Sequence, residues 1–356
     1  MHNIYHHLLD IRQKGSLLAL ATVTRTIGST PQKPGSSALF DLKGLVAGTV
    51  GGGVLEGEVQ QIAQRAIRLK ESGYYPFKLD GEISHGDGAI CGGQAGILID
   101  ASPEDHVVVF ESVKQSMINR TPGILVTIVT VNTDRGTCIQ RFWLTGIENQ
   151  TIPFLNDPVI SGEVQRLLSA GKPGDYRELD VSPTGDEHKD MVLLEAIFPP
   201  PHLVIAGAGH IGRALSHIGK LLDFEITVID DRPEHANPAN LPDADHILVM
   251  DIGRAMEELV KSPDTFVVIL TRGHKDDARA LKACIGADMA YIGMIGSKRK
   301  ITQMQKDFLE HGWAAPEEWD LIHAPVGLDI RSVSVQEIAI SIAAQLILVK
   351  NSNKPA

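Results

Sequence analysis

The sequence predicts an α/β protein in which a doubly wound parallel sheet follows a mixed α+β domain. Patterns typical of strands and helices alternate after residue 202, which indicates a parallel sheet covered by helices. A glycine-rich turn joins the first strand of this series to an amphipathic helix. Three consecutive prolines, Pro199 to Pro201, precede the series and can continue neither a helix nor a central strand. We therefore expect two domains, residues 1–198 and 199–356.

The glycine-rich turn makes the C-terminal domain Rossmann-like. An apolar strand leads into Gly207-Ala208-Gly209-His210-Ile211-Gly212, and a helix and a second strand that ends at Asp230 follow. The three glycines permit a tight turn, close approach of a diphosphate and close helix packing. The helix N-terminus offers unpaired N–H groups to phosphate. Asp230 is expected to accept a hydrogen bond from a ribose hydroxyl, while Arg232 would soften the repulsion of a 2′-phosphate.

Hydrophobic periodicity places the other elements. In the C-terminal domain we expect strands at 203–206, 225–230, 246–250, 266–270, 290–294 and 320–323, and a last helix that begins with a capping box of Ser334 and Glu337. In the N-terminal domain we expect helices at 3–14, from 54 onward, at 104–119 and at 157–170. Strands are expected at 17–24, 38–41, 45–47, 96–99, 124–131, 138–144 and 193–198.

Composition excludes several classes of protein. The net charge of −11 argues against nucleic-acid binding, and the basic cluster at 297–300 is interpreted as a solvated helix start. No segment resembles a signal peptide or a membrane span, so we expect a cytoplasmic protein. The three cysteines, Cys91, Cys138 and Cys284, are too few for an iron–sulfur cluster, which needs about four.

Two loops that follow strands are further candidates for ligand contact. Thr271, Arg272 and His274 come directly after the strand at 266–270, on the side where ligands of open α/β sheets bind. A polar loop with a turn glycine explains the same residues equally well. The segment 293–299 either presents amides to an anion or is an ordinary helix start with Ser297 as N-cap, and we favour the helix start.

The N-terminal domain contains a second glycine-rich segment. Gly51, Gly52 and Gly53 open the expected helix, and they indicate either unusual dihedrals in a turn or a cradle for a phosphate or pterin. Cys91 is followed by two glycines and is expected to be accessible, as a candidate thiolate and a candidate metal ligand. Cys138 and Cys284 lie in strand and helix patterns, and we expect both in the core.

Taken together, the motifs resemble the XdhC/CoxI family of accessory proteins for xanthine dehydrogenase and related molybdenum hydroxylases. The N-terminal part of the resemblance rests on residues 28–31, 34–35, 48–56 and 91–93. The C-terminal part rests on residues 207–212, 230–234, 271–274, 291–297 and 325–330. The resemblance implies a chaperone that binds the molybdenum cofactor and delivers its sulfurated form to an apo-enzyme. Proteins of this family are often labelled xanthine dehydrogenase, but the cysteine count argues against that activity in this chain.

We therefore expect a molybdenum cofactor chaperone, with the molybdopterin between the two glycine-rich faces and Cys91 near the metal. A dinucleotide form of the cofactor, or a separate NAD or other nucleotide, would match the diphosphate site. Expected partners are a xanthine dehydrogenase-type enzyme, a cofactor sulfurase and a second copy of the chain. Two alternatives stay open: an NAD-dependent oxidoreductase with His274 as its base, and a nucleotide-sensing regulatory module.

Overall fold

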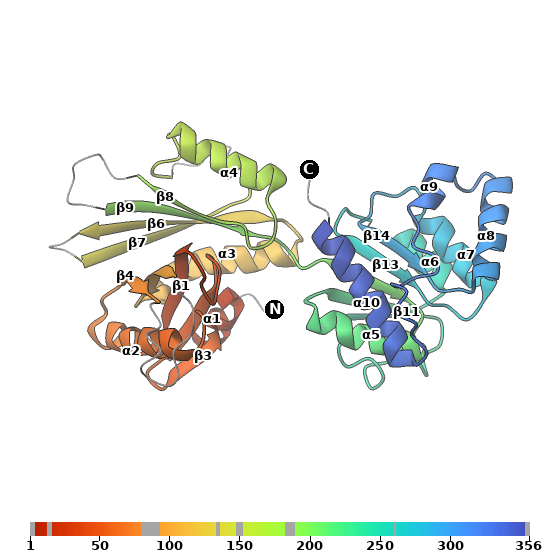
Figure 1. The fold of residues 1–356 in the computed structure, drawn as a ribbon, viewed down its shortest axis with the longest axis horizontal. Helices are drawn as coiled ribbons and strands as arrows, with labels where there is room; N and C mark the ends of the chain where they lie inside the picture. Colours follow the sequence, from red (N-terminus) through yellow and green to blue (C-terminus); the bar gives the residue numbers. More distant parts are fainter. Residues whose placement is uncertain are drawn as a thin grey trace. The chain divides into compact units, whose positions relative to one another are not determined.

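The computed structural model describes residues 4–12, 16–79, 93–132, 136–146, 152–181, 189–259 and 261–352. The chain divides into two compact units, Met1–Pro199 and Pro200–Ala356 (Figure 1). Among the described residues, no helix is long and apolar enough to cross a membrane.

The C-terminal unit contains a five-stranded sheet in the order β12-β11-β10-β13-β14, and all of its strand pairs are parallel. The strands are β10 (His202–Ala206), β11 (Glu225–Asp230), β12 (His246–Val249), β13 (Thr265–Ile269) and β14 (Tyr291–Met294). β10 and β13 are neighbours although β11 and β12 lie between them in the sequence. The strand order therefore reverses its direction between β10 and β13. Ligands of such sheets bind at this topological switch point.

Helices cover both faces of this sheet (Figure 1). One face packs against α5 (His210–Leu221) and α10 (Val335–Ser352). The other face packs against α6 (Ile252–Glu258), α7 (His274–Cys284), α8 (Lys298–Glu310) and α9 (Pro316–Asp320). The three inner strands and β14 are apolar on both sides because helices cover both faces there, whereas the edge strand β12 is largely exposed. This arrangement confirms the predicted doubly wound α/β fold.

Two predictions about this unit need correction. The strand expected at 320–323 is absent: α9 ends at Asp320, and only His323 forms an isolated bridge, to Gly293. Pro316 at the start of this segment favours the first turn of a helix. The basic cluster at 297–300 is not simply solvated, because Lys300 forms an ion pair with the buried Asp277.

The N-terminal unit contains two antiparallel sheets. The first has the order β3-β2-β1-β5-β4 and the second has the order β7-β6-β9-β8. The first sheet consists of β1 (Ala19–Ile27), β2 (Ser37–Asp41), β3 (Gly44–Gly48), β4 (Gly73–Lys78) and β5 (Gln94–Asp100). The second consists of β6 (Gly123–Asn132), β7 (Gly136–Leu144), β8 (Tyr176–Asp180) and β9 (Lys189–Ile197).

Helices pack against these sheets and form separate apolar clusters with them. They are α1 (Ile4–Arg12), α2 (Gly53–Leu69), the short 3-10 helix η1 (Pro103–His106), α3 (Val107–Ile118) and α4 (Pro158–Ala170). α2 packs against the first sheet and α4 against the second, whereas α1 and α3 contribute to a third cluster. Cys284 is buried as expected, but the prediction for Cys138 was wrong: it is exposed on β7, an edge strand.

A polar cluster lies inside the N-terminal unit. Arg141 and Asp100 form a buried ion pair, and the Tyr5 hydroxyl donates to a Glu195 oxygen at 2.5 Å. Tyr5, Arg141 and Glu195 line a cavity of about 10 Å³, large enough for roughly one water molecule. Burial raises the pKa of Glu195 to about 7, although the Tyr5 hydrogen bond and Arg141 act in the opposite direction.

Candidate functional site

The glycine-rich turn lies at the carboxyl end of β10. Gly207 has φ +126°, and a Cβ there would lie 2.4 Å from the carbonyl oxygen of Leu270. A Cβ on Gly212 would lie 2.0 Å from the Gly207 oxygen, so the helix packs closely on the turn. A Cβ on Gly209, in contrast, would have no atom within 4 Å. Gly207 and Gly212 are therefore required by packing, whereas Gly209 leaves room above the turn.

The N-terminus of α5 faces the same space. Gly209 is its N-cap and provides no side-chain acceptor for the first N–H groups. These groups have no partner within the helix, and together with the helix dipole they favour an anion. The first turn of α5 therefore has the geometry of a phosphate site.

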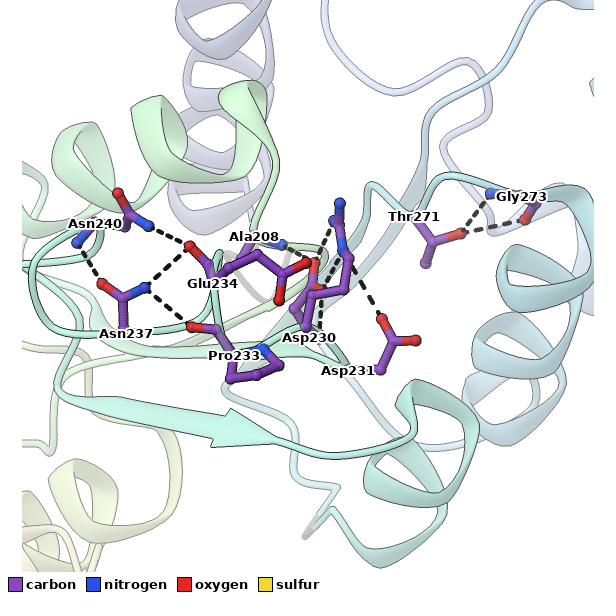
Figure 2. A network of polar contacts seen from close by, with 10 residues as sticks. Ala208, Asp230, Asp231, Pro233, Glu234, Asn237, Asn240, Thr271 and Gly273 are labelled. Carbon is purple, nitrogen blue, oxygen red and sulfur yellow. Dashed lines mark hydrogen bonds and ion pairs between the residues drawn. The ribbon is translucent and has the colours of Figure 1, made fainter.

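Asp230 holds this turn in place instead of pointing toward a ligand. Its carboxylate is 1% exposed and accepts a 2.7 Å hydrogen bond from the Ala208 amide (Figure 2). The side chain of Arg232 donates two more bonds of 2.8 Å, and its amide donates one of 3.1 Å. We expected Asp230 to accept a hydrogen bond from a ribose hydroxyl. In the structure its carboxylate oxygens already accept four hydrogen bonds from Ala208 and Arg232.

The electrostatics of this carboxylate follow from the same contacts. Burial alone would raise the pKa of Asp230, but the bonds from Arg232 and from the Ala208 amide outweigh it and lower the pKa to about 2. Asp230 is therefore ionised throughout the neutral range. Its charge is compensated by Arg232, whose pKa is raised mainly by the hydrogen bond to Asp230.

The loop after β13 lies beside the turn. Thr271 is fixed by a 2.6 Å hydrogen bond from its hydroxyl to Asp277, which is fully buried on α7. Lys300 on α8 binds the other oxygen of Asp277. Arg272 is exposed, and within the described part of the chain it forms no ion pair. The loop thus offers one uncompensated cation next to the glycine turn.

Sequence reasoning missed Asp277 and Lys300. The signal was present: an acid in the first turn after the 271–273 loop, and a lysine at the start of the next helix. Neither position has the spacing of a known motif, so the pair was detectable only after the two helices had been placed side by side.

Three other predicted residues of this unit, Ile211, His210 and His274, have side chains that contact the core or line other hollows. Ile211 packs against the core. His210 lines a separate hollow of about 600 Å³ together with Arg213 and residues 239–243. His274 is the first residue of α7, is 45% exposed and lies 3.7 Å from Asp307, lining a hollow of about 440 Å³ between α7 and α8. The side chains of His210, which belongs to the glycine turn, and of His274 therefore line two different hollows.

The second glycine-rich segment opens α2. Gly51, Gly52 and Gly53 all have positive φ, of 141°, 66° and 57°. Added Cβ atoms on Gly52 and Gly53 would meet nothing within 4 Å, and no side chain caps α2. The turn geometry thus requires these glycines, and it also leaves their surface accessible.

Other motif residues of the N-terminal unit lie against this segment. A Cβ on Gly51 would lie 3.0 Å from the Pro31 ring, and one on Gly93 would lie 2.3 Å from the Ser29 oxygen. The segment 28–31 therefore contacts both Gly51 and the buried Gly93. Cys91 lies outside the described residues, so its expected accessibility and its role as metal ligand stay predictions. Within the described residues no group of three or more His, Cys, Asp or Glu side chains is arranged to hold a metal ion.

Fold and site together define a Rossmann-type protein with a glycine-rich turn at an uncapped helix N-terminus and a separate N-terminal α+β unit. Residues 203–346 match the XdhC Rossmann domain, and residues 11–77 match the XdhC and CoxI family. The chain therefore belongs to the XdhC and CoxI family.

Individual proteins support this assignment. A Bacillus subtilis protein, named as one of the probable subunits of xanthine dehydrogenase, is 24% identical over 346 residues, which cover 96% of each chain. YqeB of Escherichia coli is 39% identical over 153 residues, but the match covers 28% of that protein and 43% of this chain. A crystal structure from Bacillus halodurans, described as a xanthine dehydrogenase, shares the fold with a TM-score of 0.77 and 24% identity, and the match covers 99% of this chain and 97% of that one.

Proposed function

We propose that this protein is an accessory protein that binds the molybdenum cofactor and delivers it to a xanthine dehydrogenase-type molybdenum hydroxylase. One observation carries the proposal: an uncapped helix and an accessible Gly209 lie at the switch point of the sheet. Family membership and the name of the Bacillus subtilis relative support the recipient enzyme.

The residues present fit the phosphate of such a cofactor. The amides of the first turn of α5 would donate to its oxygens, and Arg272 would add charge from the neighbouring loop. In the N-terminal unit, the glycine segment 51–53 is a separate candidate contact for the cofactor. The cofactor itself supplies redox chemistry at molybdenum in the recipient enzyme. This chain would hold it, and would protect it from water.

A dinucleotide-dependent oxidoreductase is less well supported. Its ribose would need a free acceptor at Asp230, yet that carboxylate is 1% exposed and bound by Ala208 and Arg232. His274, the candidate base for that alternative, lines the hollow between α7 and α8. A nucleotide-bearing form of the molybdenum cofactor would require that Arg232 moves or itself contacts the added phosphate.

Anaerobic titration of the protein with molybdopterin, followed by fluorescence, tests the proposal. We expect micromolar binding, and a loss of at least about tenfold for Gly209→Asp because an added carboxylate would repel the phosphate. Gly162→Asp is the matched control, since Gly162 lies on α4 in the other unit and an added Cβ there would also meet nothing within 4 Å. Absence of binding at about a hundred times that concentration would refute the proposal.

Cys91 requires a separate measurement. Activation of the recipient apo-enzyme by the loaded protein is expected to fall for Cys91→Ser if the thiol contacts the metal. A nucleotide-sensing module predicts unchanged activation, together with affinity for nucleotide that depends on the partner. NADH turnover with small alcohols or aldehydes would favour the oxidoreductase instead.

A further inference from the structure

Helices α7 and α8 lie side by side (Figure 1), and two adjoining hollows lie between them. The first, which we call the aromatic hollow, has a volume of about 440 Å³, and the second, the basic hollow, has a volume of about 380 Å³. His274 lines both hollows, and a 2.8 Å hydrogen bond joins Gln303 in the basic hollow to Asp307 in the aromatic one. The two hollows therefore form one trough that follows α8.

The aromatic hollow has the size and the lining of a small-molecule site. Such sites measure about 300–1,000 Å³ and are lined mainly by apolar and aromatic side chains with a few polar groups. Here the apolar and aromatic lining consists of Ala278, Met304, Phe308, His311 and Trp313. Trp313 stacks on His311 and meets the edge of Phe308, yet it stays 37% exposed. A flat aromatic ring is the kind of group that packs well among these rings.

The basic hollow favours an anion through its side chains. Arg299 and Lys300 line it together with Ser297. The Ser297 hydroxyl already caps the first turn of α8 by accepting from the Lys300 amide, so the positive charge of the hollow comes from side chains. Lys300 is compensated by Asp277, whereas Arg299 is exposed and forms no ion pair with any described residue. Arg299 is therefore available to a negatively charged group.

The junction of the two hollows carries further uncompensated charge. Lys275, next to His274, is exposed and has no ion-pair partner among the described residues. Arg279 also lines the aromatic hollow, but Asp251 holds it through two hydrogen bonds. The chain as a whole has a net charge of −11, so unpaired cations gathered along one trough are a local exception. This charge is complementary to an anionic ligand.

From these observations we propose that the trough binds a purine nucleoside diphosphate, with its base in the aromatic hollow and its phosphates in the basic hollow. Asp307 is 34% exposed and would accept a hydrogen bond from an amino group of the base. Arg299 and Asp307 are eight residues apart on α8, which is about 12 Å along the helix axis and within the span of such a ligand. This site does not include the glycine turn, and the inference does not rest on the proposed cofactor function.

Isothermal titration calorimetry of the full chain with ADP tests the proposal. We expect a dissociation constant below about 100 μM. Adenosine lacks the phosphates and pyrophosphate lacks the base, so each should bind at least about tenfold more weakly than ADP. Pyrophosphate that binds as tightly as ADP would indicate a simple anion site and would overturn the proposal, and so would absence of ADP binding up to about 5 mM.

Substitutions at the two ends of the trough separate its parts. Arg299→Glu is expected to weaken ADP binding at least about tenfold through loss of the phosphate contact, and Trp313→Ala at least about fivefold through loss of an aromatic contact. Lys306→Glu is the matched control, because Lys306 reverses the same charge on the same helix, is 63% exposed and lines neither hollow. Circular dichroism establishes that each variant is folded. ADP binding that Arg299→Glu and Trp313→Ala both leave intact would contradict the assignment.

Gly209→Asp distinguishes this site from the glycine turn. We expect this variant to bind ADP as the wild type does, and Arg299→Glu to bind molybdopterin as the wild type does. Loss of ADP binding in Gly209→Asp alone would assign the nucleotide to the glycine turn and overturn the inference. Failure of the wild type to bind molybdopterin would refute the proposed function and leave the expectation for ADP unchanged.

Discussion

The contact of Asp230 with the glycine turn makes a quantitative prediction for Asp230→Asn. The carboxyl pKa is 3.8 in the absence of contacts and about 2 in the folded protein. Each unit of difference between the folded and unfolded pKa corresponds to about 1.4 kcal/mol, so ionised Asp230 contributes about 2.4 kcal/mol to the free energy of unfolding. The asparagine also turns an amide N–H toward the donors of Arg232 or Ala208, which adds to the loss.

The sign of the pH dependence follows from the lowered pKa. The contribution is fully present above the unfolded pKa of 3.8 and disappears as the pH falls through the folded value of about 2. The ionised carboxylate contributes about 2.4 kcal/mol at pH 7 and about 1.3 kcal/mol at pH 3, and the loss from the asparagine amide adds to the difference at both pH values. The difference between wild type and variant must therefore shrink as the solution becomes acidic.

Urea unfolding at both pH values measures this difference. Trp313 and Trp319 report on the C-terminal unit, and Trp143 reports separately on the N-terminal unit. Asp231→Asn is the control: its carboxylate is 57% exposed and lies 3.9 Å from Arg232, so we expect less than about 0.5 kcal/mol. The reasoning fails if Asp230→Asn costs the same at pH 3 as at pH 7, or no more than the control.

Three further substitutions test other parts of the structure. Gly212→Ala should destabilise the protein by about 2–4 kcal/mol in urea unfolding, because its Cβ would lie 2.0 Å from the Gly207 oxygen. Asp277→Ala should lower the melting temperature strongly, by the equivalent of about 3–5 kcal/mol, because it leaves Lys300 without its buried partner. Glu195→Gln should remove a pH dependence: burial raises the pKa of Glu195 from 4.5 to about 7, so wild-type stability falls by up to about 3 kcal/mol as the pH rises through that interval.

Each of these three has its own control. Gly57→Ala, on α2 with nothing within 4 Å of the added Cβ, should be neutral or stabilising, and equal losses at Gly57 and Gly212 would contradict the packing argument. Lys306→Ala removes an ion pair of which both side chains are at least 60% exposed, and it should cost less than about 1 kcal/mol. If the urea midpoint of wild type and Glu195→Gln changes identically between pH 5 and pH 8, another group controls that dependence.

The sequence was sufficient for the C-terminal sheet because four of its strands, β10, β11, β13 and β14, are mostly buried. The resulting apolar runs are short and are separated by helices, so β11 was predicted at 225–230 and occurs there. The strands missed were β4 and β8, which lie at the edges of their sheets. Pro76 interrupts β4, and β8 alternates weakly because it contains Arg177, Glu178 and Asp180.

The candidate site was predictable in position but not in all its contacts. Spacing alone placed Asp230 at the end of the second strand, next to the turn. Whether a carboxylate there faces a ligand or the protein depends on which donors fold back onto it, and Arg232, only two residues further on, does so. Cys138 was misplaced for a related reason, because strand periodicity does not say which strand of a sheet is the outermost one.

The segment that precedes α10 connects the end of the chain to β14, an edge strand of the sheet. The Val326 amide donates to the Met294 oxygen, the Gly327 amide and the Tyr291 hydroxyl share the Gln345 side chain, and Ser341 bonds to Leu328. A chain cut before Val335 would thus lose its last helix, three of these four hydrogen bonds and much of the cover of one sheet face at once. Proteolytic trimming at this end should consequently destroy the whole C-terminal unit rather than release a shorter, still folded product.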